Sequence, residues 1–252
     1  MRSLDPLIAK LERLGPLTPE ERDALEALPS RLKELRRHET IVEAGTSPRE
    51  SIILLTGMAF RVKMLPEGTR QVVALHVPGD FMDLHSYVLH PMDHAVVAAS
   101  PAMMALVPHE KLDLILDRYP RLTKRLMWDM AIDAAVAREW MAIMGKASAM
   151  RQLAHLFCEI HYRMEQVSLA NRTGFELALS QIDLADICGL STVHVNRSLQ
   201  ALRAEGLIVF QHGRLAIPDL PRLVEAAGFD PAYLHLLTGT QLPGNYAQPS
   251  TV

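Results

Sequence analysis

The chain has 252 residues, 49% of them hydrophobic and 22% charged, which is enough for one large domain or two small ones. With a formal net charge of −3, the protein has no overall positive charge that would attract nucleic acid, so any affinity for DNA must come from a local basic patch. The sequence has no apolar run of the roughly 18 residues that cross a bilayer, no signal-like N-terminus, and no disulfide or metal-ligand spacing at Cys158 and Cys188. We therefore expect a cytoplasmic protein without a membrane partner.

Two helical segments open the sequence, one over about 4–14 and one from Thr18, which can cap a helix with Pro19 in its first position. From about residue 39, short β-rich runs alternate with turns that contain glycine or proline. The runs are 40–42, 51–55, 60–65, 71–77, 96–99 and 103–107. Strands this short, with turns this frequent, predict an antiparallel β-roll of about eight strands over 39–108.

A long helical run follows Pro120 and continues to about Lys146. At 1.5 Å per residue it is roughly 39 Å long, too long for both of its sides to be buried within one small subunit. The surplus apolar face indicates a partner helix from a second copy, although a long helix inside one chain's core remains the alternative. The predicted dimer interface consists of Leu122, Leu126, Met130, Ala134, Ala137 and Met141.

Residues 180–217 carry the clearest functional pattern. Ser180 can cap a short helix, a turn follows at Gly189, and Ser191 can cap a second helix. An apolar stripe at Val195, Leu199 and Leu202 directs the opposite side of that second helix to solvent. The pattern predicts a helix-turn-helix, in which the start of the second helix enters the major groove of DNA.

The outward side chains suit the edges of bases. Arg197 can reach O6 and N7 of guanine, Asn196 can pair with adenine, and Val193 can contact a thymine methyl group. A hairpin after Gly206 predicts the wing of a winged helix, with Arg214 near a phosphate. The alternative is an ordinary helical hairpin with a solvated polar face. The predicted DNA contacts are Ser180, Ser191, Thr192, Val193, His194, Asn196, Arg197, Gln200 and Arg214.

These motifs resemble those of the Crp/Fnr family of bacterial transcription regulators. Segments 180–185 and 189–197 resemble the family's helix-turn-helix signature, 201–208 its run into the wing, and 77–81 its β-roll turn. The resemblance spans nearly the whole chain and implies an α+β fold and a regulator, not an enzyme. It further implies a homodimer that binds double-stranded DNA at a pseudo-palindromic operator and contacts RNA polymerase. The implied division is a cyclic-nucleotide-binding-like roll with N-terminal helices (1–118), a dimerisation helix (119–146), a winged helix-turn-helix (147–238) and a tail (239–252).

The roll departs from the family's cyclic-nucleotide-binding members. Those members hold the ribose with a Gly-Glu pair and the phosphate with an arginine followed by serine or threonine. An ungapped alignment places Asp83-Leu84 and His94-Ala95 there. Because a neutral histidine cannot replace an arginine fork, cyclic AMP is not expected to be the effector. The alternative is a small-molecule, haem or redox signal in the roll, with Asp83, Leu84, His85, His94 and Ala95 as candidate pocket residues.

Other sensing chemistries receive less support. The N-terminal cysteine cluster of iron–sulfur members is missing, since no cysteine precedes Cys158. Histidines cluster at 76, 85, 90 and 94, and two of them could hold haem or a metal. Together with Asp83 or Asp93 they could also form a metal-dependent enzyme site. Because loop histidines are usually solvated, no cofactor or metal is predicted. Cys188 in the turn could block DNA binding on oxidation, or could simply be buried. Val193 stands where many family members have glutamate, so the operator should differ at that base pair.

Overall fold

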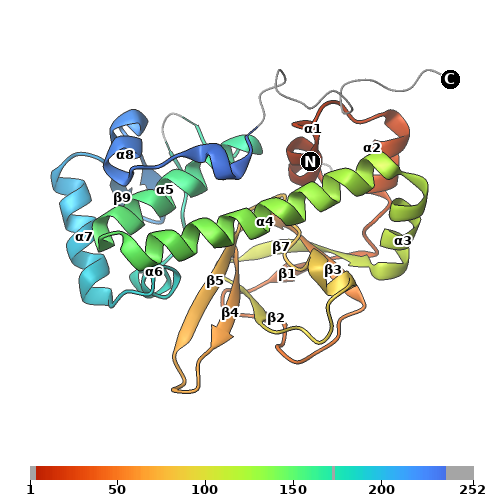
Figure 1. Cartoon of the computed structure of the whole chain (residues 1–252), viewed down its shortest axis with the longest axis horizontal. Coiled ribbons are helices and arrows are strands. Elements are labelled where there is room, and N and C mark those ends of the chain that lie inside the picture. Colours follow the sequence, from red (N-terminus) through yellow and green to blue (C-terminus); the bar gives the residue numbers. More distant parts are fainter. Residues whose placement is uncertain (1–3, 172–173, 237–252) are drawn as a thin grey trace.

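The computed structural model describes residues 4–171 and 174–236, and it confirms the predicted succession of β-roll, long helix and winged helix-turn-helix (Figure 1). Helices α1 (Asp5–Glu12) and α2 (Pro19–Glu26) open the chain. The backbone N–H of Glu21 donates to Thr18 at 3.2 Å, and the Glu21 carboxylate accepts from the Thr18 N–H at 2.9 Å. Thr18 therefore begins α2 with the expected reciprocal cap. The predicted tail, 239–252, lies outside the described residues.

The roll consists of two antiparallel sheets, one ordered β1-β7-β3 and the other β2-β6-β4-β5. The strands are β1 (Arg31–Leu35), β2 (Thr40–Val42), β3 (Glu50–Thr56), β4 (Ala59–Met64), β5 (Arg70–His76), β6 (Ala95–Ala98) and β7 (Ala102–Pro108). A short 3-10 helix, η1 (Leu84–Tyr87), lies between β5 and β6. Sequence reasoning missed β1, because four of its five residues are exposed and no apolar alternation marks it.

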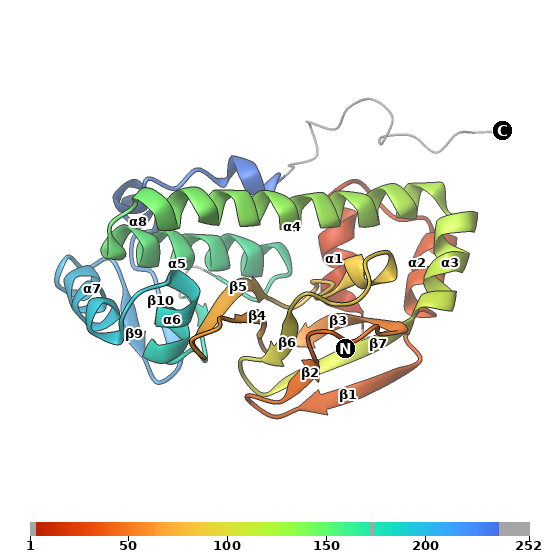
Figure 2. The same ribbon diagram turned by 60° about the horizontal axis from the view of Figure 1, so that its bottom comes forward.

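Three helices follow the roll: α3 (His109–Arg118), α4 (Pro120–Lys146) and α5 (Ala149–Gln166). In both views α4 runs the length of the molecule, from α2 and α3 at one end to the winged helix at the other (Figures 1 and 2). The predicted run is thus one continuous helix, which Gly145 does not interrupt. Across the described ranges, no helix is both long enough and apolar enough to cross a bilayer.

The winged helix-turn-helix lies at the far end of α4. Its elements are β8 (Phe175–Glu176), α6 (Gln181–Cys188), α7 (Thr192–Ala204), β9 (Val209–Gln211), β10 (Arg214–Ala216), α8 (Leu220–Ala227) and the 3-10 helix η2 (Pro231–Leu234). The three strands form a sheet ordered β8-β10-β9. The predicted hairpin after Gly206 is β9–β10, which β8 extends at one edge.

The assignment of Leu122 and Leu126 to a dimer interface is wrong. Their side chains are 0% and 2% exposed, because they belong to a core cluster shared with Leu7 and Leu11 of α1. The buried Arg125 guanidinium beside them donates to the carbonyl of Leu11 at 2.5 Å. The N-terminal helices therefore cover the first turns of α4, a covering that the periodicity of α4 alone could not reveal.

Candidate functional site

The two helices of the helix-turn-helix begin at capped positions. The N–H of Asp183 donates to Ser180 Oγ at 3.1 Å, and the N–H of Ser180 donates to Asp183 Oδ2 at 2.8 Å, so α6 starts with a reciprocal cap. Gly189 ends α6 in the left-handed region with φ of 62°, which glycine adopts without a steric cost. The N–H of His194 then donates to Ser191 Oγ at 3.3 Å and begins α7. These local signals fix the direction in which α7 leaves the turn.

Helix α7 has one buried side and one exposed side, as its spacing predicts. Val195, Leu199 and Leu202 are fully buried in the core of the winged helix. The predicted base-contacting and neighbouring side chains of α7 are exposed: Thr192, Val193, His194, Asn196, Arg197 and Gln200. Of the two capping residues, Ser191 is exposed and Ser180 half-buried. The exposed side of α7 therefore presents one guanidinium, two side-chain amides and an apolar Val193 as a single surface.

Sequence reasoning missed Gln181. Its side chain, exposed on the first turn of α6, accepts a hydrogen bond from Asn196 Nδ2 at 3.2 Å. The bond uses one N–H of Asn196 and leaves its carbonyl oxygen and second N–H available, the pair that recognises adenine. Gln181 therefore orients Asn196. Its position directly after the cap of α6, beside the start of α7, was the signal that could have identified it.

The wing places Arg214 next to its turn. His212 and Gly213 have φ of 50° and 71° and connect β9 to β10 through two residues. Arg214 is exposed at the start of β10, while the adjacent Leu215 is buried and anchors the strand. Arg203 of α7 donates to the carbonyl of Phe210 at 3.0 Å. The wing is thus attached to the C-terminal half of α7.

An apolar stripe remains exposed on α4. Met130, Ala134, Ala137 and Met141 of the predicted interface are all exposed, and Met144 continues their spacing at one end of the stripe. Sequence reasoning missed Met127, which extends the stripe at the other end. The six positions alternate in steps of three and four residues, the spacing of the a and d positions in a coiled coil. We call the six residues the methionine–alanine seam.

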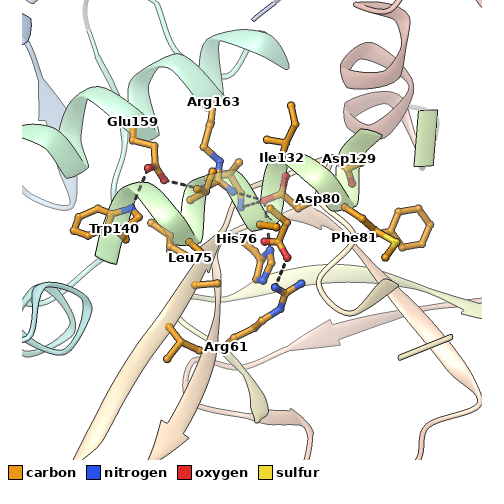
Figure 3. Close-up of a pocket in the computed structure, with 18 of the residues that line it drawn as sticks. Arg61, Leu75, His76, Asp80, Phe81, Asp129, Ile132, Trp140, Glu159 and Arg163 are labelled. Atoms are coloured by element: carbon orange, nitrogen blue, oxygen red, sulfur yellow. Dashed lines mark hydrogen bonds and ion pairs between the residues drawn. The ribbon is translucent and has the colours of Figure 1, made fainter. Parts of the chain in front are cut away.

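A cavity of about 870 Å³ lies beside α4, between β5 and α5 (Figure 3). Of the five candidate pocket residues, Leu84, His85 and His94 line it. Asp83 and Ala95 do not line it, which corrects their assignment. The Asp83 carboxylate instead accepts from the N–H of Ile52 at 2.7 Å, and burial raises the pKa of Asp83 to about 7. Asp83 is a structural residue of the roll.

Lysine and arginine side chains from elements far apart in the sequence line this cavity. Inspection of residues 81–108 alone could not reveal them. In the described chain the lining contains four lysine or arginine side chains and five carboxylates. Each cation is paired: Arg61 with Asp133, Lys63 with Asp93 at 2.8 Å, Lys10 with Asp80 at 2.7 Å and with Asp129, and Arg163 with Asp80 at 2.5 Å and Glu159 at 3.0 Å. Figure 3 shows Arg163 and Asp80 directed toward one another. Burial alone would raise the pKa of Asp80, but Lys10 and Arg163 hold it well below its ordinary value.

Comparisons with known proteins agree with this geometry at both ends of the chain. Residues 151–226 match the Crp-like helix-turn-helix domain, and residues 32–119 match the cyclic nucleotide-binding domain. The chain is 30% identical over 175 residues to the nitrogen fixation regulation protein FixK of Bradyrhizobium diazoefficiens, covering 69% of this chain and 71% of the relative. The chain belongs to the Crp/Fnr family. Like other members of that family, it is a transcription regulator with a helix-turn-helix DNA-binding domain.

Two further similarities describe this Crp/Fnr regulator. It is 28% identical over 197 residues to the transcriptional activator protein FnrL of Cereibacter sphaeroides, covering 76% of this chain and 78% of that protein. The structure of FixK2 from Bradyrhizobium japonicum superposes with a TM-score of 0.69 at 24% identity, covering 78% of this chain and 96% of FixK2. The second comparison supports the arrangement of roll, long helix and winged helix.

Two neutral histidines, His85 and His94, line the Crp/Fnr cavity, and His94 stands where the ungapped alignment places the arginine of cyclic-nucleotide-binding members. The His94 ring, at the aligned position, hydrogen-bonds Asp93 through Nδ1 at 2.7 Å, and its centroid lies 5.0 Å from that of His85. Burial lowers the pKa of both rings, that of His85 to about 4. Both Nε2 atoms are buried without a hydrogen-bond partner among the described residues. Of the other two clustered histidines, His76 is buried beside Asp80 and His90 is exposed. Within residues 4–171 and 174–236, no group of three histidine, cysteine or carboxylate side chains is placed to hold a metal ion.

The regulator's two cysteines are expected to be chemically inert at neutral pH. Cys158 and Cys188 are buried, and burial raises the pKa of each thiol to about 12, so almost no reactive thiolate forms. Iodoacetamide at pH 7.5 should label neither cysteine in the folded protein within the time that labels both after unfolding, as read by mass spectrometry. Rapid labelling of native Cys188 with loss of DNA binding would instead support an oxidation switch.

Proposed function

We propose that this regulator binds a two-fold symmetric operator as a homodimer, with α7 of each copy in the major groove. One observation carries the proposal: Arg197 and Asn196 lie on the same exposed side of α7, and a hydrogen bond to Gln181 orients Asn196. Arg197 can donate two hydrogen bonds to guanine, and Asn196 can exchange two with adenine. The exposed Arg214 of the wing would meet a phosphate and fix the register of the protein on the duplex.

The methionine–alanine seam supports the homodimer. From Met127 to Met144 it follows about 26 Å of helix, and two such seams can pack as a parallel coiled coil. Alanine at the two central positions allows the helix axes to approach closely, while methionine fills the space at both ends. A two-fold axis along α4 would present the two α7 helices symmetrically, so the operator would share that symmetry. We propose 1–118 as the sensor part, 119–146 as the dimerisation helix and 147–238 as the DNA-binding part, with RNA polymerase as the further partner.

The function is tested by selecting bound sequences from a random pool of DNA duplexes with the full chain. We expect a two-fold symmetric consensus in which each half contains a guanine for Arg197 and an adjacent adenine for Asn196. Binding should weaken steeply with salt, because phosphate contacts release counterions. A pool that shows no enrichment, or an enriched sequence without two-fold symmetry, would contradict the proposal.

A second candidate, a regulator gated by a ligand in the roll, is favoured by the cavity of about 870 Å³. Its carboxylates outnumber its cations, and its unpartnered histidine nitrogens belong to neutral rings. Such a site suits an uncharged ligand that donates hydrogen bonds better than it suits an anion. Repeating the selection with and without uncharged candidate effectors separates the gated regulator from an ungated one.

Cyclic AMP is expected not to bind at micromolar concentration. Its phosphate carries a full negative charge, and moving that charge out of water is unfavourable unless a cation replaces the water. His94 is neutral, and Lys63 and Arg61 are already paired with carboxylates. Calorimetry at pH 7.5 should show no saturable heat, and DNA affinity should not change on addition of the nucleotide. A micromolar dissociation constant, or DNA binding that requires cyclic AMP, would be the contrary result.

A further inference from the structure

The roll holds the first helix of the helix-turn-helix through side chains that are far away in sequence. Arg70 of β5 donates to Asp186 Oδ2 at 2.8 Å through Nε and at 2.5 Å through a terminal nitrogen, and it lies 3.3 Å from Asp183 Oδ1. Gln71 donates to the backbone carbonyl of Asp186 at 2.8 Å. Arg37, which follows β1, pairs with the second oxygen of Asp183. Two separate segments of the roll thus contact α6, and we call these contacts the roll–α6 clasp.

The clasp ends on a buried carboxylate and not on a solvated surface. The Asp183 side chain is 1% exposed and also closes the reciprocal cap with Ser180. Removing the partner of a buried charge is costly, so this pairing has more consequence than an exposed ion pair. Burial by itself would raise the pKa of Asp183, but hydrogen bonds from Ser180 and the charge of Arg37 lower it, which keeps the carboxylate ionised.

Elsewhere the winged helix is held by a short connection and side-chain contacts to α4, by the Arg163–Asp80 ion pair to the roll, and by an apolar core that β4 and β5 share with α5. The chain passes from Lys146 to Ala149 between α4 and α5, and Trp140 of α4 donates to Glu159 of α5 at 3.0 Å. These attachments lie on the α5 side of the winged helix, whereas the clasp holds α6, the helix that precedes the recognition helix (Figure 2). Attachments on two sides fix the orientation of the winged helix more firmly than attachments on the α5 side alone.

We propose that Arg70, together with Arg37, is a positioning residue that sets the distance between the two DNA half-sites which the dimer accepts. The inference rests on the proposed binding of a two-fold operator. In the dimer, α4 lies on the symmetry axis, so the angle of each winged helix to its α4 determines the separation and twist of the two α7 helices. One extra base pair moves a half-site by about 3.4 Å and turns it by about 35°. A winged helix held on both sides resists that change, whereas one without the clasp is held only on its α5 side and can tilt to follow it.

The test uses the full chain and three duplexes: the selected operator, the same operator with its centre lengthened or shortened by one base pair, and a single half-site. For the wild type we expect at least a 10-fold loss of affinity on changing the centre by one base pair. For Arg37→Ala/Arg70→Ala we expect less than about a 3-fold loss, with half-site affinity within about 2-fold of the wild type. Asp186→Asn removes the main partner of Arg70 but leaves the cap between Ser180 and Asp183 intact, and should shift the spacing profile in the same direction.

Arg31→Ala/Arg49→Ala is the matched control, because it removes the same charge from exposed positions of the roll that do not contact α6. It should retain the wild-type spacing profile. An unchanged profile in both clasp variants overturns the inference, as does loss of half-site binding in both, which would make the clasp a requirement for folding of the helix-turn-helix. A wild type without any preferred spacing would instead contradict the proposed dimeric operator.

Discussion

Arg197→Ala is expected to weaken binding to the selected operator by about 1–3 kcal/mol for each half-site, or about 5- to 150-fold. The reason is geometric: Arg197 is exposed on the same side of α7 as Asn196, where its guanidinium can donate two hydrogen bonds to one guanine. A dimer reads two half-sites, so the loss of binding free energy on a full operator is about twice the loss on one half-site if the two contacts are independent. Fluorescence anisotropy with the operator and with random duplex measures both affinities.

The decisive comparison is between specific and random DNA. Loss of a base contact should spare random DNA and relax the preference for guanine at one position. Arg214→Ala is the matched variant, because it should lower affinity for every sequence alike and reduce the salt slope by about 1. If Arg197→Ala weakened both duplexes equally, Arg197 would be a phosphate contact and not a base reader.

Met130→Glu/Met141→Glu is expected to convert the protein to monomers. Both side chains are exposed on the methionine–alanine seam, so glutamates there would place four carboxylates between two packed helices. Like charges removed from water without partners cost several kcal/mol, which should raise the dimer dissociation constant at least about 100-fold. Analytical ultracentrifugation should give the monomer mass, and operator binding should fall toward the affinity for one half-site.

Ala142→Glu controls for the added charge, because Ala142 is exposed on α4 but lies off the seam. It should remain dimeric. Leu126→Glu, which a dimer interface containing Leu126 would have suggested, should instead unfold the N-terminal part, since Leu126 is buried beneath α1. A dimer of unchanged stability in Met130→Glu/Met141→Glu would place the interface elsewhere.

Local signals made much of the fold predictable. Ser180, Ser191 and Thr18 mark helix starts because their hydroxyl groups satisfy backbone N–H groups within three residues, which a sequence displays directly. The stripe of Val195, Leu199 and Leu202 likewise determines which side of α7 is exposed. Strand β1 gave no comparable signal, because its charged, exposed residues form an edge strand that β7 holds by backbone hydrogen bonds.

Long-range contacts were the part that the sequence could not provide. Spacing showed that α4 has more apolar surface than one core needs, but not that α1 covers Leu122 and Leu126 while Met127 and Met144 stay exposed. The cations of the cavity come from α1, β4 and α5, so inspection of 81–108 could not find them. The pairing of Arg70 with Asp186 joins residues 116 positions apart, and no local pattern encodes it.

The ion cluster around Asp80 has a consequence for engineering the chain. Asp80 belongs to the turn after β5, yet its two cations are Lys10 of α1 and Arg163 of α5. A cut between α4 and α5 would leave the sensor fragment with fewer cations than buried carboxylates, and would leave Arg163 in the DNA-binding fragment with Glu159 in place of its two carboxylate partners. The two parts therefore do not behave as interchangeable modules. A chimera that places this winged helix on a foreign roll loses one of the two carboxylates that pair with Arg163, and a roll transferred without α5 leaves Lys10 to pair with both Asp80 and Asp129.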